Sequence, residues 1–268
     1  MTVCPHSKWR VASALGSLVL FCAPAARADC ALPASQTSIL RPASEFDARR
    51  VRRIEGRYRH ERLSDGAFLG FERWRYLAHA DGTQTLVAEY QAEAGAASLR
   101  LMAHVDADFR PLEVWEDVRV KGEFGGAWIL NVDGRSAVAC LVLPGGESSR
   151  TIEVPGVFAV DFGVAAGVGW RTIVDGSVPL VRRHSTILVI GDPLHGQSGA
   201  RNMFRNQRFA LLGREIIDVP AGRFETLRVK ASGGELYWLT PKSRILVRSQ
   251  DVRRGIAHVL VEVAGETR

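Results

Sequence analysis

Residues 191–202 contain the densest set of chemically capable side chains in this 268-residue chain. Long, polar, Gly-rich loops held by strands are common places for binding residues. The candidate ligand-binding residues are therefore Asp192, His195, Ser198, Arg201 and Asn202. An ordinary hairpin loop uses the same residue types, because Gly, Asp, Asn and Ser all favour turns. A simple hairpin loop without a ligand is therefore the alternative interpretation of residues 191–202.

A hydrolase is the enzymatic alternative for this loop, with His195 acting together with Asp192 or Ser198. The segment Gly196-Gln197-Ser198-Gly199-Ala200 lacks the glycine two places after the serine that a nucleophile elbow needs. We therefore assign no catalytic residue and favour a binding protein over an enzyme.

Metal and cofactor sites also lack their usual sequence patterns. The histidines after residue 28 occur singly, and no His-x-His, His-Glu-x-x-His or Cys-x-x-Cys spacing is present. Gly163, Gly167 and Gly169 fit neither the dinucleotide fingerprint nor the phosphate-binding loop. The sequence predicts no metal and no cofactor.

The first 28 residues have the pattern of an export signal. Lys8 and Arg10 precede an apolar stretch over residues 11–24, and Ala26-Arg27-Ala28 matches a cleavage site. The stretch is too short for a permanent membrane span. We expect cleavage after Ala28 and a periplasmic protein of the cell envelope that does not span a membrane. Lipid attachment is disfavoured, because neither Cys22 nor Cys30 follows a small neutral residue.

The charge of the mature chain is mild. The leader contains three of the 35 basic residues and none of the 29 acidic ones, which leaves 32 basic residues against 29 acidic ones. We expect no nucleic-acid partner. The main basic cluster starts with Arg49, Arg50, Arg52 and Arg53 and continues to Arg62. It is either a solvated face that discourages edge pairing or a contact for anionic lipid headgroups or cell-wall polymer.

Two cysteines remain after cleavage, Cys30 and Cys140. In an oxidising compartment they can form a disulfide that ties the N-terminal segment to a strand. The alternative is that Cys140 is a small buried hydrophobic residue.

From residue 57 onward, alternating runs of six to ten residues are separated by turn sequences such as Ser64-Asp65-Gly66, Asp81-Gly82, Gly125-Gly126 and Asp133-Gly134. This spacing predicts antiparallel hairpins. Alternation over residues 99–105 and 112–120 predicts one dry face and one wet face. The run 137–143 is apolar on both faces, which predicts a strand covered on both sides.

The predicted fold is all-β, a long curved antiparallel sheet approaching an open barrel. A closed barrel or a sandwich remains possible, because a sheet of about a dozen strands must curl or split. A short helical or irregular crossover is expected near residues 155–170, and residues 41–53 are a candidate helix capped by Ser44. The domain organisation is a signal peptide over 1–28, an arginine-rich segment over 29–52 and a single β-rich domain over 53–268.

Two segments carry a family resemblance, Val219-Pro220-Ala221-Gly222-Arg223-Phe224 and Tyr237-Trp238-Leu239-Thr240-Pro241. Together with the opening hairpin at Arg57-Tyr58, they resemble the exported bacterial proteins grouped as domain of unknown function 3108. The resemblance implies an exported, mostly β protein on a long curved sheet. It implies no activity, since the matching residues are turn and core positions.

Two functions follow as hypotheses. The first is a periplasmic protein that binds an apolar or amphipathic envelope molecule, such as a lipid, in the hollow of the sheet. The tryptophans could line such a hollow, although sheet aromatics more often fill the core. The second is an assembly partner that docks another envelope protein through a sheet edge or the arginine-rich segment.

Overall fold

The computed structural model describes residues 50–155, 158–161, 164–168, 183–189 and 204–265. Within these residues the chain forms a 15-stranded sheet in the order β8-β7-β6-β5-β4-β3-β2-β1-β15-β14-β13-β12-β11-β10-β9. The first strands are β1 (Arg50–Arg62), β2 (Phe68–His79), β3 (Gln84–Ala92), β4 (Ala97–Val105), β5 (Pro111–Val120), β6 (Glu123–Asp133), β7 (Ser136–Leu143) and β8 (Gly146–Glu153). They are followed by β9 (Ala159–Asp161), β10 (Arg183–Val189), β11 (Phe204–Val219), β12 (Gly222–Ala231), β13 (Leu236–Leu239), β14 (Leu246–Asp251) and β15 (Ile256–Gly265).

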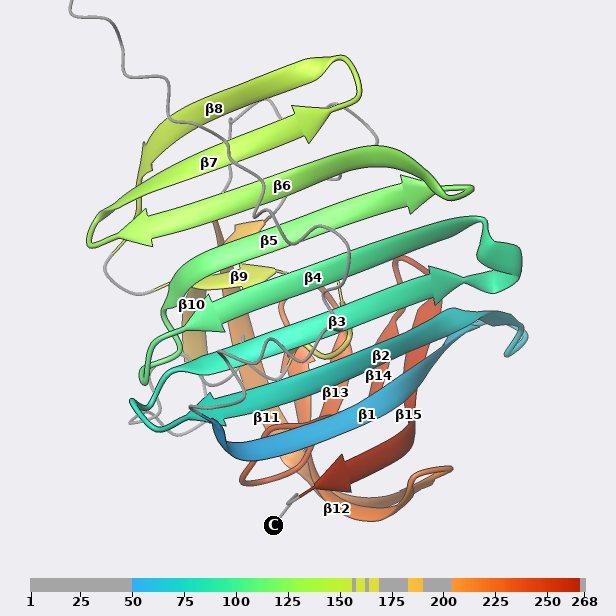
Figure 1. Cartoon of the computed structure of the whole chain (residues 1–268). Coiled ribbons are helices and arrows are strands. Elements are labelled where there is room, and N and C mark those ends of the chain that lie inside the picture. Colours follow the sequence, from blue (N-terminus) through green and yellow to red (C-terminus); the bar gives the residue numbers. More distant parts are fainter. Residues whose placement is uncertain (1–49, 156–157, 162–163, 169–182, 190–203, 266–268) are drawn as a thin grey trace, which may run out of the picture.

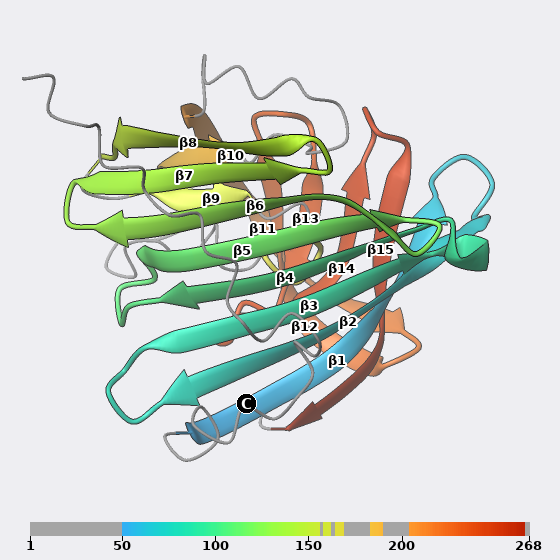
Figure 2. The same ribbon diagram turned by 45° about the horizontal axis from the view of Figure 1, so that its top comes forward.

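The sheet bends so that its two halves face each other. Strands β1 to β8 make a broad layer, and β10 to β14 stand behind it at a steep angle (Figures 1 and 2). The pairing of β1 with β15 joins the halves. Strands β8 and β9 are the two ends of the strand order, so the described sheet is open rather than closed into a barrel. The predicted fold class is therefore confirmed.

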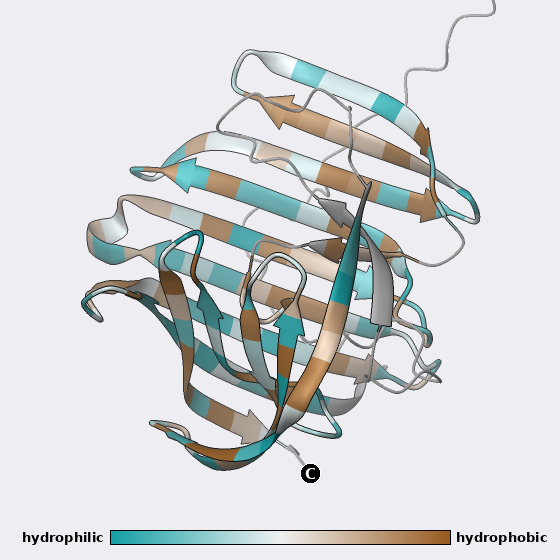
Figure 3. Cartoon of the chain, turned by 180° about the vertical axis from the view of Figure 1, so that it is seen from behind, coloured by the Kyte–Doolittle hydropathy of each residue, from teal (hydrophilic) through white to brown (hydrophobic). Residues whose placement is uncertain are grey.

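One hydrophobic core lies between the two halves. The concave side of β1 to β7 contributes residues such as Tyr58, Leu101 and Leu130, and the second half contributes residues such as Val229 and Leu260. Hydrophobic and hydrophilic residues alternate along the strands, as the brown and teal bands of Figure 3 show, and the hydrophobic ones form this concave face. The edge strand β8 is mostly exposed and hydrophilic, whereas its neighbour β7 is apolar.

The predicted faces are confirmed on the inner side and wrong in part on the outer side. Leu101, Ala103 and Val105 are buried in the core as expected. However, Trp115 and Asp117, which alternation places on the wet face of β5, are both buried. Alternation predicts which residues share a face, but it does not predict whether another layer covers that face.

Two local predictions need correction. Residues 50–53 are part of strand β1 rather than a helix. Gly125 and Gly126 lie inside β6, where the register shift opposite Val118 and Arg119 marks a β-bulge, and the turn is instead at Lys121 and Gly122. Glycine tolerates a bulge as well as a turn, so the sequence signal is ambiguous.

The expected crossover contains the strand β9, which pairs with β10 in parallel. Every other strand pair in the described sheet is antiparallel. Residues 164–168 follow as bends and turns, and they are buried. In the described ranges no helix is both long and apolar enough to cross a bilayer.

Candidate functional site

Most of the residues selected from the sequence lie outside the described part of the chain. This holds for Asp192, His195, Ser198, Arg201 and Asn202, and also for Arg49 and Cys30. Arg50 and Arg52 are in β1, and the Arg53 guanidinium donates to Glu55, with 3.0 Å between Nε and Oε2. Cys140 is disulfide-bonded. The ligand-binding role of the loop and the pairing of Cys30 with Cys140 stay predictions.

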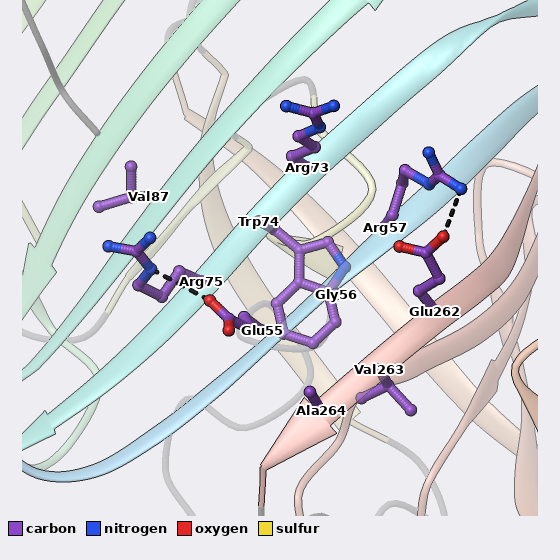
Figure 4. A pocket seen from close by; sticks show the side chains of 10 residues that line it. All are labelled: Glu55, Gly56, Arg57, Arg73, Trp74, Arg75, Val87, Glu262, Val263 and Ala264. Atoms are coloured by element: carbon purple, nitrogen blue, oxygen red, sulfur yellow. Dashed lines mark hydrogen bonds and ion pairs between the residues drawn. The ribbon is translucent and has the colours of Figure 1, made fainter. Parts of the chain in front are cut away.

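The described residues do form a pocket at the junction of the two halves, on strands β1, β2, β3 and β15 (Figure 4). Its volume is about 480 Å³. It is lined by Glu55, Gly56, Arg57, Arg73, Trp74, Arg75, Val87, Glu262, Val263 and Ala264. Cationic side chains and apolar surface therefore meet in one place.

Strand register brings the three arginines of the pocket together. Arg57 on β1 is directly opposite Arg73 on β2, and Arg75 lies two residues further along the same face. Like charges directly opposite each other in an antiparallel pair are destabilising. A fold that keeps this arrangement has a surplus of positive charge at one point of its surface.

Carboxylates neutralise two of the three guanidinium groups. Arg57 donates to Glu262 across the β1–β15 pair, and Arg75 Nε lies 3.5 Å from Glu55 Oε2. Arg57 also packs over the ring of Phe71, with 4.6 Å from Cζ to the ring centre. Arg73 is exposed and has no carboxylate partner among the described residues. Its charge is available to an anion.

Three shielded donors of the pocket residues also lack a hydrogen-bond acceptor. They are Nε of Arg57, Nε of Arg75 and Nε1 of Trp74, and none of them has a hydrogen-bond partner within the described structure. A buried polar group without a partner costs about 1–3 kcal/mol. Such donors are rare in folded proteins and indicate a missing partner, such as water or a ligand.

A second polar cluster lies inside the core, on the concave side of β1 and β2. The carboxylate of Glu72 is fully buried and accepts hydrogen bonds from the backbone N–H groups of Ala165 and Ala166, each at 2.8 Å. His60 Nε2 lies 3.1 Å from Glu72 Oε2. The hydroxyl of Tyr76 donates to the carbonyl of Ala166. Glu72 and Tyr76 thus hold residues 164–168 against the sheet.

The tyrosines of this cluster are held in their protonated form. Burial, followed by the negative charge of Glu72, raises the pKa of Tyr76 and of Tyr90 above that of a free tyrosine. Burial is also the main cause of the raised pKa of Tyr58. The hydroxyls of Tyr76 and Tyr90 donate to the backbone carbonyls of Ala166 and Leu69, which suits a structural role, whereas the buried Tyr58 hydroxyl has no hydrogen-bond partner within the described structure.

A serine and a histidine meet at the margin of the same cluster. Ser249 Oγ lies 2.6 Å from His258 Nδ1, and the His258 ring packs edge-on against His60 at 4.4 Å. Ser249 is only 2% exposed, so a substrate carbonyl cannot reach its hydroxyl in this conformation. The contact orients side chains between β14 and β15 and is not a nucleophile–base pair that meets a substrate.

Sequence reasoning missed both clusters. It grouped Arg57 with its neighbours along the chain, whereas Arg73 and Arg75 join it only through strand pairing. A glutamate in the midst of the apolar, inward-facing positions of β2 was the available signal for Glu72, because such a residue needs buried partners.

Comparisons with known proteins show no family for this chain. No family model matches the chain. No curated protein matches it. Among solved structures, it is similar to a β-barrel-like protein of domain of unknown function 1849 from Brucella abortus, with a TM-score of 0.49 and 9% identity over 81% of this chain and 99% of that one.

A protein of the DUF1089 family from Pseudomonas aeruginosa is also similar, with a TM-score of 0.39 and 12% identity over 67% of this chain and 88% of that one. Neither of these two proteins is described as a member of family 3108.

Proposed function

We propose that this protein is a non-enzymatic binding protein of the cell envelope, and that it binds an amphipathic molecule through an anionic group held at the Arg57–Arg73–Arg75 pocket. The proposal includes export to the periplasm after cleavage behind Ala28, and membership of an exported β-rich family such as 3108. The observation that carries it is the pocket, in which the Arg73 guanidinium has no carboxylate partner among the described residues and lies beside Arg57 and Arg75, whose shielded Nε atoms have no hydrogen-bond acceptor there.

The charge and shape of the pocket favour this ligand class over a purely apolar one. Charge-assisted hydrogen bonds from arginine to phosphate or carboxylate are stronger than neutral ones. Val87, which is opposite Arg75 in the β2–β3 pair, supplies apolar surface for the adjoining part of the ligand, whereas Trp74 and Val263 pack in the core on the other face of the sheet. Residues 164–168 already occupy part of the concave side, so the outer pocket is better supported than the hollow as the binding place.

Binding to vesicles tests this directly. Protein purified from the periplasm is mixed with vesicles of zwitterionic lipid containing increasing fractions of an anionic phospholipid, and the bound fraction is measured by sedimentation. We expect binding that rises with the anionic fraction and falls with salt. Arg73→Gln should weaken it several-fold, because Arg73 is the guanidinium without an internal carboxylate.

Arg135→Gln is the matched control, since this exposed arginine pairs with Glu153 at the far end of the sheet. Soluble lipid phosphates in a parallel titration separate headgroup recognition from adsorption to a charged surface. Equal binding by the two variants, or no dependence on anionic lipid, would rule out the pocket as the binding place.

The edge strand β8 supports a second candidate function, docking of another envelope protein by strand addition. Its residues are almost all exposed, and β8 ends the strand order of the described sheet. An exposed edge offers unpaired N–H and C=O groups to an incoming strand. Cross-linking in cells should then recover one defined partner, and Thr151→Pro in β8 should abolish its recovery while the fold is retained.

A further inference from the structure

A row of arginine and aromatic side chains crosses the junction between the two halves of the sheet. Register places its members directly opposite one another on β12, β13, β14, β15, β1 and β2, in the order Arg228, Trp238, Arg248, Val259, Arg59 and Phe71. Directly opposite residues in antiparallel strands point to the same face. The adjacent residues Tyr237 and Leu260 belong to the core, so this arginine row faces outward.

The arginines of the row are evenly spaced. Arg59, Arg248 and Arg228 occupy every second strand, so their backbones are about 10 Å apart from one to the next. From Arg59 to Arg228 the row covers four strand spacings, or about 19 Å. A repeating array of guanidinium groups matches a ligand whose negative charges also repeat.

Trp238 holds two of these guanidinium groups in place. The Cζ atoms of Arg228 and Arg248, which come from the strands on either side, lie 5.5 Å and 5.8 Å from the centre of the Trp238 ring. The indole is buried, and its Nε1 donates to Glu215. A guanidinium stacked on an aromatic ring keeps the N–H donors of its planar fork available to an anion. Such preorganised side chains lose less freedom when an anion binds.

Carboxylates do not neutralise the whole row. Arg228 Nε lies 3.8 Å from Glu215 Oε1, and Arg59 Nε lies 3.0 Å from Glu61 Oε1. Arg248 is exposed, and the described residues provide it with no carboxylate partner. The surplus positive charge of the row is therefore at its middle arginine.

We propose that the arginine row binds a linear polyanion, a polysaccharide that carries carboxylate or phosphate groups. This surface is separate from the lipid pocket proposed above, although Phe71, over which Arg57 packs, adjoins both. The row crosses the place where the sheet bends, and β10 to β14 stand at a steep angle to β1 to β8 (Figures 1 and 2). A flat bilayer cannot contact both ends of a row on the outside of such a bend, whereas a flexible chain can follow it.

The dependence of binding on polymer length tests the row as a whole. Octagalacturonate, digalacturonate and the neutral maltooctaose are titrated into the full chain, and binding is followed by calorimetry. We expect octagalacturonate to bind at least about tenfold more tightly than digalacturonate, because only the longer chain engages several arginines at once. Equal affinity for the two acidic sugars, or comparable binding of maltooctaose, would overturn the proposal.

Single substitutions test which arginines contribute. Arg248→Gln should weaken octagalacturonate binding several-fold, and Arg59→Gln should weaken it less, because Glu61 already neutralises part of the Arg59 charge. Arg150→Gln is the matched control, since it removes the same charge from an exposed position on β8. Circular dichroism verifies that each variant is folded. The row is not the binding place if Arg248→Gln and Arg150→Gln bind octagalacturonate equally.

Vesicle binding separates this surface from the lipid pocket. Arg248→Gln should bind anionic vesicles as the wild-type protein does, whereas Arg73→Gln should not. If Arg248→Gln instead loses vesicle binding and keeps octagalacturonate binding, the row is a membrane contact and the polyanion proposal is wrong. Failure of vesicle binding in the wild-type protein would contradict the lipid pocket alone and leave the octagalacturonate result to decide on the row.

Discussion

At the scale of single residues, the core depends on one buried carboxylate. Glu72 is fully buried and satisfies two backbone N–H groups and a histidine, and the segment it holds has no strand pairing of its own at residues 164–168. Removing such a group leaves buried donors without an acceptor. The loss of stability therefore comes more from these desolvated donors than from the lost hydrogen bonds themselves.

We expect Glu72→Ala to lower the free energy of unfolding by about 3–5 kcal/mol, the range for removing one partner of a buried charged cluster. Urea denaturation followed by circular dichroism measures this. Glu89→Gln on the outer face is the control, and it should cost less than about 1 kcal/mol because its ion pair with Arg100 is partly exposed. Similar losses in the two variants would mean that Glu72 does not anchor residues 164–168.

A second prediction at this scale concerns pH. Burial raises the pKa of Asp117, although Arg100 and Arg119 pull it down. Because the folded-state pKa lies above the unfolded value, this group favours the folded state most at acidic pH, and that contribution is lost as pH rises through the folded pKa. Asp117→Asn should therefore increase stability at neutral pH, with the gain disappearing in acid.

Thermal unfolding of Asp117→Asn and wild type across pH 3 to 8 gives the comparison. Asp108→Asn serves as the control, because its carboxyl is largely exposed. A gain that persists undiminished at the acidic end would assign the effect to something other than the ionisation of Asp117.

At the scale of elements, close approach between strands limits what β1 can contain. A Cβ on Gly56 would lie 2.5 Å from the Glu262 carbonyl oxygen and 2.6 Å from Cζ2 of Trp74. We expect Gly56→Ala to destabilise the fold by about 1–3 kcal/mol through overpacking. It should also weaken anion binding, since Trp74 and Arg57 line the same pocket.

Gly145→Ala provides the matched comparison, because a Cβ there meets nothing within 4 Å. Chemical denaturation of both variants distinguishes a local steric clash from a general effect of replacing glycine. Equal stability of the two variants would show that β1 can shift away from Trp74.

The turns also show where local sequence is sufficient. Ser64-Asp65-Gly66 and Asp133-Gly134 connect strands as predicted, because Asp and Gly suit positions that few other residues tolerate. Gly125-Gly126 does not form the predicted turn, because a glycine pair also permits a bulge within a strand.

At the scale of the whole molecule, the two halves share one core and should unfold together. Leu101 is fully buried in a cluster that also contains Val229 and Leu246 from the opposite half. We expect Leu101→Ala to cost about 2–5 kcal/mol and to accelerate hydrogen exchange in β12 to β14 as well as in β3 to β5. Faster exchange confined to β3 to β5 would show that the halves unfold independently.

The sequence by itself determined the class of fold and the inner face of the strands. Period-two alternation and turn residues are local properties, so the sequence alone is sufficient to place Leu101, Ala103 and Val105 in the core. Only the tertiary structure decided that Arg57 meets Arg73, that Glu72 holds residues 164–168, and that Trp115 is covered on the outer face. These facts depend on strand order and on the packing of distant segments, which no single stretch of chain encodes.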